Sequence, residues 1–95
     1  MTNMNNKFEG LDSAAIVCSH VASGTKQIRI AERSIPMDEA DSGWQFCCGE
    51  ETEDWTEAEV WSLREVLLLE PSLSQFVGLP AETALTRNVL SNRWE

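Results

Sequence analysis

The sequence lacks several features on which common functions depend. No apolar run approaches the roughly 20 residues that a membrane-spanning helix needs, and the N-terminal MTNMNNKFEG lacks the basic end and apolar core of a signal peptide. Phosphate-cradling glycine loops, GxSxG, HExxH and CxxC motifs are also absent. We therefore expect a cytoplasmic protein that does not span a membrane and is not an enzyme.

Histidine and cysteine are scarce. His20 is the single histidine, and the three cysteines are an odd number, so at least one stays outside any intramolecular disulfide. The sequence neighbours Cys47 and Cys48 are poorly placed to pair with each other, and on a strand they face opposite sides. We expect reduced cysteines, one of the adjacent two buried, with no cofactor and no metal needed for folding. Redox or metal chemistry is the alternative.

Basic residues are also scarce. Seven bases stand against sixteen acids, which gives a net charge of −9. Eleven of the acids lie between Asp38 and Glu70, where Arg64 is the only base. The negative electrostatic field of such a segment disfavours binding to nucleic acid and to anionic membranes, and it accelerates association with a basic partner. The acidic segment is therefore either a recognition face or a surface that only keeps the protein soluble.

The first part of the chain predicts β-structure. Ala14–Val21 is an apolar run that contains His20, and residues 25–32 alternate between apolar and polar. With a Ser-Gly turn signal between them, we expect these two runs to pair as an antiparallel hairpin, with His20 on a strand.

The turn Asp41-Ser42-Gly43 is expected to lead into a core strand. An aspartate side chain accepts a hydrogen bond from the backbone two residues on, and glycine tolerates a positive φ. Period two then places Trp44, Phe46 and Cys48 on one face, where the aromatic rings supply much of the buried area. We expect Trp44 and Phe46 to be core residues.

The second half predicts one main helix, a short helical turn and a last strand. Thr56 is the expected helix cap, and a stripe of Val60, Leu63, Val66 and Leu67 is its apolar face. Pro71 ends this helix and begins a short helical turn. Residues 82–88 read as a strand, and Trp94 as an anchor for the C-terminus. The fold class is α+β, a small antiparallel sheet packed against one main helix plus a short helical turn. Residues 1–13 are expected as a flexible tail and 14–95 as one domain.

Several motifs in the chain occur together in one known family. Asp41-Ser42-Gly43-Trp44 with Gly49-Glu50, Glu70-Pro71-Ser72-Leu73, and Gly78-Leu79-Pro80 followed by Arg87 resemble the immunity protein thirty-three domain of bacterial polymorphic toxin systems. The resemblance covers residues 14–87. It implies a non-enzymatic protein that binds and neutralises a protein toxin, and the charge argument adds that the toxin is basic.

The expected partner-binding residues are rim acids and two tryptophans. The acids would steer a basic partner, and an exposed indole would supply a desolvated anchor. The acidic run also lacks the alternating oxygen ligands of a calcium loop, so no metal is expected there. The set is Asp41, Glu50, Glu51, Glu53, Asp54, Trp55 and Trp61. A small acidic accessory or regulatory protein-interaction domain is the alternative function, and an enzyme of unknown type is a third.

Overall fold

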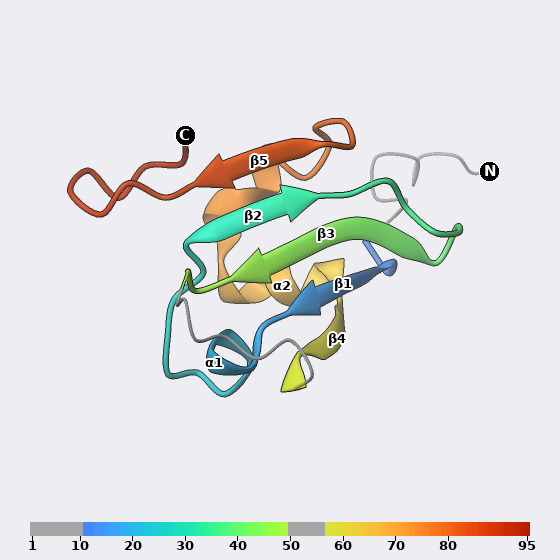
Figure 1. Cartoon of the computed structure of the whole chain (residues 1–95), viewed down its shortest axis with the longest axis horizontal. Helices are drawn as coiled ribbons and strands as arrows, with labels where there is room; N and C mark the ends of the chain where they lie inside the picture. The colour runs from blue at the N-terminus through green and yellow to red at the C-terminus, as the bar shows by residue number, and fades with distance from the viewer. Residues whose placement is uncertain (1–10, 50–56) are drawn as a thin grey trace.

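A computed structural model of the protein describes residues 11–49 and 57–95. The strands form one sheet in the order β4-β1-β3-β2-β5, and α2 lies behind it in Figure 1, while the described residues place no helix over the front face. This confirms the α+β class. In chain order the elements are β1 (Ala14–Val17), α1 (Ser19–Ala22), β2 (Ile30–Arg33), β3 (Asp41–Cys47), β4 (Glu59–Ser62), α2 (Leu63–Leu69), the 3-10 helix η3 (Pro71–Gln75) and β5 (Thr83–Thr86).

The sheet is mostly antiparallel, with one parallel pair. β1 pairs with β3 in parallel, whereas the pairs β1–β4, β2–β3 and β2–β5 are antiparallel. The expected hairpin between residues 14–21 and 25–32 is therefore wrong, because β1 lies between β3 and β4. Ala15 and Val17 of β1 are fully buried. A strand with a neighbour on each side buries such side chains better than a strand of an isolated two-stranded hairpin does. The chain turns into α1 at Ser19, so the expectation that His20 lies on a strand is also wrong.

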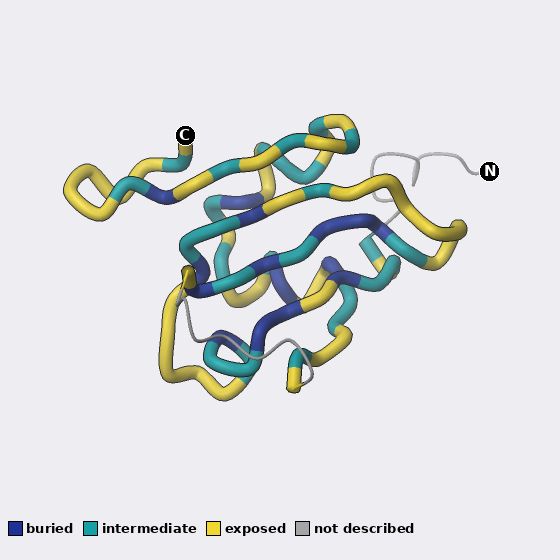
Figure 2. Tube along the Cα trace, viewed as in Figure 1, coloured by how far each residue is buried: buried dark blue, intermediate teal, exposed yellow. Residues whose placement is uncertain are grey.

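The core lies between the sheet and the helices. Trp44 and Phe46 are 1% and 0% exposed, and their rings stack with centroids 5.7 Å apart at an interplanar angle of 12°. The indole Nε1 of Trp44 donates to the carbonyl oxygen of Val77 at 3.0 Å. Cys48 is also buried and Cys47 only half-buried. Figure 2 shows buried positions along β1 and β3, and Trp44, Phe46 and Cys48 are buried as the alternation in the sequence predicts.

The main helix begins later than expected. Residues 59–62 form β4, which pairs with β1, and α2 begins after Ser62. The Ser62 hydroxyl accepts from the backbone N–H of Glu65, and the Glu65 carboxylate accepts from the backbone N–H of Ser62 at 2.9 Å, a capping box. Val60, expected on the apolar helix face, is instead 71% exposed on the edge strand. Thr56, the expected cap, lies outside the described residues.

The C-terminal third follows the prediction. The helix ends before Pro71, which begins η3, and β5 occupies the middle of the expected last strand. Trp94 bridges to Arg87 as an isolated β-bridge, and its indole donates to the Ser72 hydroxyl at 3.0 Å. Trp94 thus ties the C-terminal segment to η3.

At the other end, Leu11 packs against the core, and its carbonyl accepts from the backbone of Arg64. Residues 1–10 lie outside the described ranges, so the extent of the N-terminal tail stays a prediction. No helix in either described range is long and apolar enough to cross a membrane.

Candidate functional site

The Asp41-Ser42-Gly43 sequence forms a bulge in the central strand β3. Ala14 of β1 pairs with Asp41 but Ile16 pairs with Gln45, so β3 carries extra residues opposite β1. The Ser42 hydroxyl links the two strands at the bulge, because it donates to the Ala14 carbonyl at 2.7 Å and accepts from the backbone N–H of Trp44 at 3.1 Å. The bulge thereby sets the register that buries Trp44.

Asp41 organises the turn that precedes the bulge. Its Oδ1 accepts from the backbone N–H of Gly43 and its Oδ2 from that of Met37, both at 2.9 Å. The expected hydrogen bond to the backbone two residues on is therefore confirmed. Because both carboxylate oxygens hold the local backbone, Asp41 has a structural task in the isolated protein.

The predicted partner-binding residues are not all at one place. Asp41 is the first residue of β3, and Gly49 follows the last residue of β3, Cys47. The six residue steps from Asp41 to Cys47 span about 20 Å along a strand, so Asp41 and Gly49 lie at opposite ends of β3. The acids that follow Gly49 in the sequence (Glu50, Glu51, Glu53 and Asp54) and Trp55 lie outside the described residues. A contact between Asp41 and a partner stays a prediction.

Trp61 lies on β4, the edge strand beside β1. It is partly buried against the core, and its indole Nε1 donates to Oε1 of Glu59 at 2.9 Å. Glu59 and Glu57 are exposed, and Glu59 pairs with Val17 at the end of the sheet where β3 also ends. The acidic stretch therefore resumes, after the undescribed residues, on the edge strand at the same end of the sheet as Gly49.

Two of the few basic side chains point inward, which sequence analysis did not foresee. Arg33 donates through Nε to the carbonyl of Ser42 at 2.9 Å and through Nη1 to that of Leu79 at 2.6 Å. The Arg87 guanidinium, with a side chain only 9% exposed, binds Oε1 of Glu70 at 2.8 Å. These two arginines hold segments of the chain together. They therefore contribute less positive charge to the described surface than a count of basic residues suggests.

Three cysteines also come together. The sulfur atoms of Cys18, Cys47 and Cys48 lie within 4.8 Å of one another, and Sγ of Cys48 lies 3.5 Å from Nδ1 of His20. Sequence reasoning missed this cluster because the parallel pairing of β1 with β3, which it did not predict, brings residue 18 to residues 47 and 48. These side chains are the strongest set of soft metal ligands in the described part of the chain.

Comparison with known protein families matches residues 15–95 to a family described as the Immunity protein Imm33 domain. No curated protein and no solved structure matches the chain. The matched range contains four strands and all of β1 except Ala14, and it includes the Asp41–Trp44 bulge, the inward-facing arginines and Trp94.

Proposed function

Because the chain belongs to the Imm33 immunity protein domain family, we propose that it binds a protein toxin in the cytoplasm and neutralises it without catalysis. The family match carries this proposal. Binding needs only a complementary surface, and the absence of known catalytic motifs from the sequence is consistent with that mode of action.

The charge distribution supports a basic toxin as the partner. Acids outnumber bases sixteen to seven, and Arg33 and Arg87 direct their guanidinium groups to internal acceptors. Complementary potentials raise the rate of encounter and suppress wrong partners. Many enzymes that act on nucleic acid bind phosphate with basic clefts, and an acidic protein seated over such a cleft would block it.

We propose that the recognition surface combines the acids that follow Gly49 in the sequence with the exposed residues of the edge strand β4 and its approach. We call it the acidic edge, and it consists of Glu50, Glu51, Glu53, Asp54, Trp55, Glu57, Glu59 and Trp61. Glu57 and Glu59 are exposed, and the Glu59 carboxylate orients the indole of Trp61. A partner that displaces this hydrogen bond would gain an aromatic anchor flanked by acids.

The test needs a cognate toxin, which is to be sought among the products of genes adjacent to the gene of this protein. The wild-type protein should protect cells that express this toxin and should bind it in a purified system. Replacing Glu50, Glu51, Glu53 and Asp54 by lysine should slow association by about tenfold or more at low salt and reduce protection.

The matched control reverses four exposed acids elsewhere, Glu32, Glu39, Glu82 and Glu95, which produces the same change in net charge. This control should retain more association and protection than the first variant. Equal losses in both variants would contradict the acidic edge but not toxin binding. Absence of both binding and protection with the wild-type protein would contradict the proposed function itself.

A further inference from the structure

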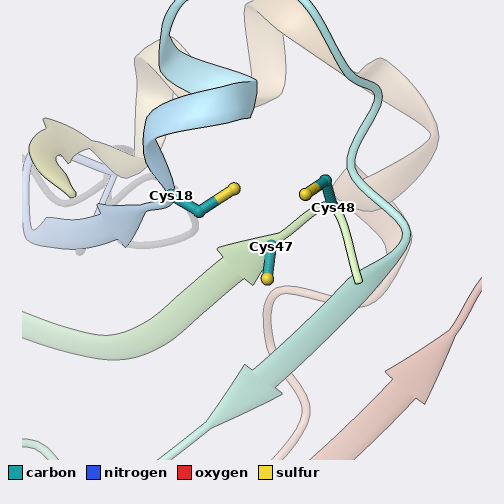
Figure 3. A group of neighbouring side chains, drawn as sticks. All are labelled: Cys18, Cys47 and Cys48. Atoms are coloured by element: carbon teal, nitrogen blue, oxygen red, sulfur yellow. The ribbon is translucent and has the colours of Figure 1, made fainter. Parts of the chain in front are cut away.

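The parallel pairing of β1 with β3 brings distant cysteines to one end of the sheet. Val17 pairs with Phe46, and the backbone N–H of Cys18 donates to the Phe46 carbonyl at 3.0 Å. This register places Cys18 beside Cys47 and Cys48. Figure 3 shows the sulfur atoms of Cys18 and Cys48 turned toward each other between the start of α1 and the end of β3.

We propose that Cys18, Cys47 and Cys48 bind a zinc ion through their sulfur atoms, with Nδ1 of His20 as the fourth ligand. Three cysteines and one histidine are a common ligand set of structural zinc sites. The 3.5 Å between Nδ1 of His20 and Sγ of Cys48 matches the spacing of about 3.5 Å that tetrahedral geometry requires, given Zn–S of about 2.3 Å and Zn–N of about 2.0 Å.

Binding requires local adjustment of Cys47 and of His20, because the ligand atoms that lie close to one another are the three sulfurs, and Nδ1 of His20 lies near the sulfur of Cys48 rather than near all three. Sulfur ligands of one tetrahedral zinc ion lie about 3.8 Å apart, whereas the three sulfurs here lie within 4.8 Å of one another. In Figure 3 the sulfur of Cys47 points away from the other two, so its side chain must turn to another rotamer. Cys47 is half-buried, while Cys18 is fully buried, so the cysteine that must move is the one with more room.

Zinc binding here would add a cross-link between the ends of β1 and β3, which are distant in the sequence and already hydrogen-bonded to each other. The three thiols release their protons to solvent as the ion binds, and the folded state gains the binding free energy. The ion would fix the junction of β1 and α1 to the end of β3, next to Gly49, where the undescribed residues begin. The proposal revises the sequence-based expectation of no metal, and it does not depend on toxin binding.

Cobalt(II) provides the probe. The reduced wild-type protein, titrated with Co²⁺ in the presence of a non-thiol reductant, should develop a thiolate-to-cobalt charge-transfer band at one equivalent, and Zn²⁺ should abolish it. Saturating Zn²⁺ at about 100 times its Kd should raise the thermal midpoint by roughly 10 °C. A reduced protein that gives no such band with cobalt, or whose midpoint zinc leaves unchanged, would overturn the proposal.

Variants identify the ligands. Cys47→Ser should lower the cobalt affinity by about 100-fold or more and reduce the band per bound ion by about one third. Its metal-free thermal midpoint should stay near that of the wild type, which separates ligand loss from misfolding. Cys47→His restores a zinc ligand and should recover part of the affinity. His20→Asn should keep the sulfur band but weaken binding. A Cys47→Ser protein that binds cobalt as the wild type does would overturn the three-sulfur site.

Discussion

At the residue scale, Gly43 is the position where the backbone restricts the choice of amino acid most strongly. Its φ is +85°, and a Cβ there would overlap the carbonyl oxygen of Ser34, whose backbone N–H donates to the Gly43 carbonyl. Neither neighbour can withdraw without breaking the pairing of β2 with β3. A glycine is therefore needed at this position for two separable reasons, conformation and space.

We expect Gly43→Ala to lower the free energy of unfolding by about 3 kcal/mol or more, of which about 1–3 kcal/mol comes from the positive φ. Gly24 is the matched control, because its φ is +84° but no described atom lies within 4 Å of a Cβ built there. Gly24→Ala should therefore show the conformational cost alone. Urea unfolding of both variants measures the difference, and equal losses would contradict the steric argument.

The Arg87–Glu70 ion pair is the second residue-scale feature with a large expected effect. Both side chains are mostly buried, at 9% and 16% exposed, and Arg87 also stacks over the Trp94 ring at 5.5 Å. Removing one partner of a buried pair leaves the other without compensation. We expect Arg87→Met to cost about 3–5 kcal/mol, measured by chemical denaturation.

The exposed pair Arg64–Asp12 serves as the comparison, since its side chains are 52% and 85% exposed. Arg64→Met should change stability by about 0–1 kcal/mol. Adding Glu70→Leu to Arg87→Met should recover part of the loss, because the buried carboxylate is then no longer unpaired. A loss in Arg87→Met no larger than that in Arg64→Met would show that the buried pair does not stabilise the fold.

At the element scale, α2 depends on its capping box. Ser62→Ala removes the acceptor for the Glu65 backbone N–H and should lower stability by about 1 kcal/mol. Ser62→Asp keeps an acceptor and should lose less. Thr56→Ala tests the helix start that the sequence predicts. Thermal melts of the three variants should rank Ser62→Ala as the least stable, and a larger loss in Thr56→Ala would contradict the observed start of α2.

The sequence predicted helices and strands best where local chemistry determines them. Trp44 and Phe46 alternate after a turn that Asp41 and Gly43 specify, and this part of the structure agrees with the prediction. Pro71 likewise ends α2 as expected. In each case a neighbouring residue supplies the donor, the acceptor or the φ angle that settles the local conformation.

Prediction failed where pairing between distant segments decides the structure. Thr56 to Glu59 and Ser62 to Glu65 both fit the S/T-x-x-E capping pattern, so the helix start could not be chosen locally. Pairing with β1 draws residues 59–62 into β4 and leaves Ser62 as the cap. A second non-local pairing, that of β1 with β3, places Cys18 beside Cys47, so no sequence spacing signalled the cysteine cluster.

At the scale of the whole molecule, the sequence stretches on which the family resemblance rests serve mainly to hold the fold. The Asp41–Trp44 bulge, Glu70, Ser72 and Arg87 all bind other parts of the same chain. Leu79, in the Gly78-Leu79-Pro80 motif, accepts from Arg33. Residues occupied in this way are poor candidates for distinguishing one toxin from another. We therefore expect specificity to reside in exposed positions, and the acidic edge is the one we propose here.

The net charge predicts how association depends on salt. Exposed charges are screened over about 8 Å at physiological ionic strength, so the association rate with a basic toxin should fall by about tenfold or more between low and high salt. The dissociation rate should change much less. Stopped-flow mixing across a salt series measures both rates. A flat association rate would indicate that the acids do not steer the encounter.

The place of β1 in the sheet has a consequence for synthesis on the ribosome. The first strand in the sequence, β1, lies between β3 and β4. The ribosome therefore makes both neighbouring strands, residues 41–47 and 59–62, after β1 itself. The β2–β3 hairpin forms from adjacent segments, whereas β1 must close loops of more than twenty residues to find either partner. A nascent chain that ends before β4 therefore holds β1 with one edge unpaired, and cooperative folding waits until the second half of the protein has emerged.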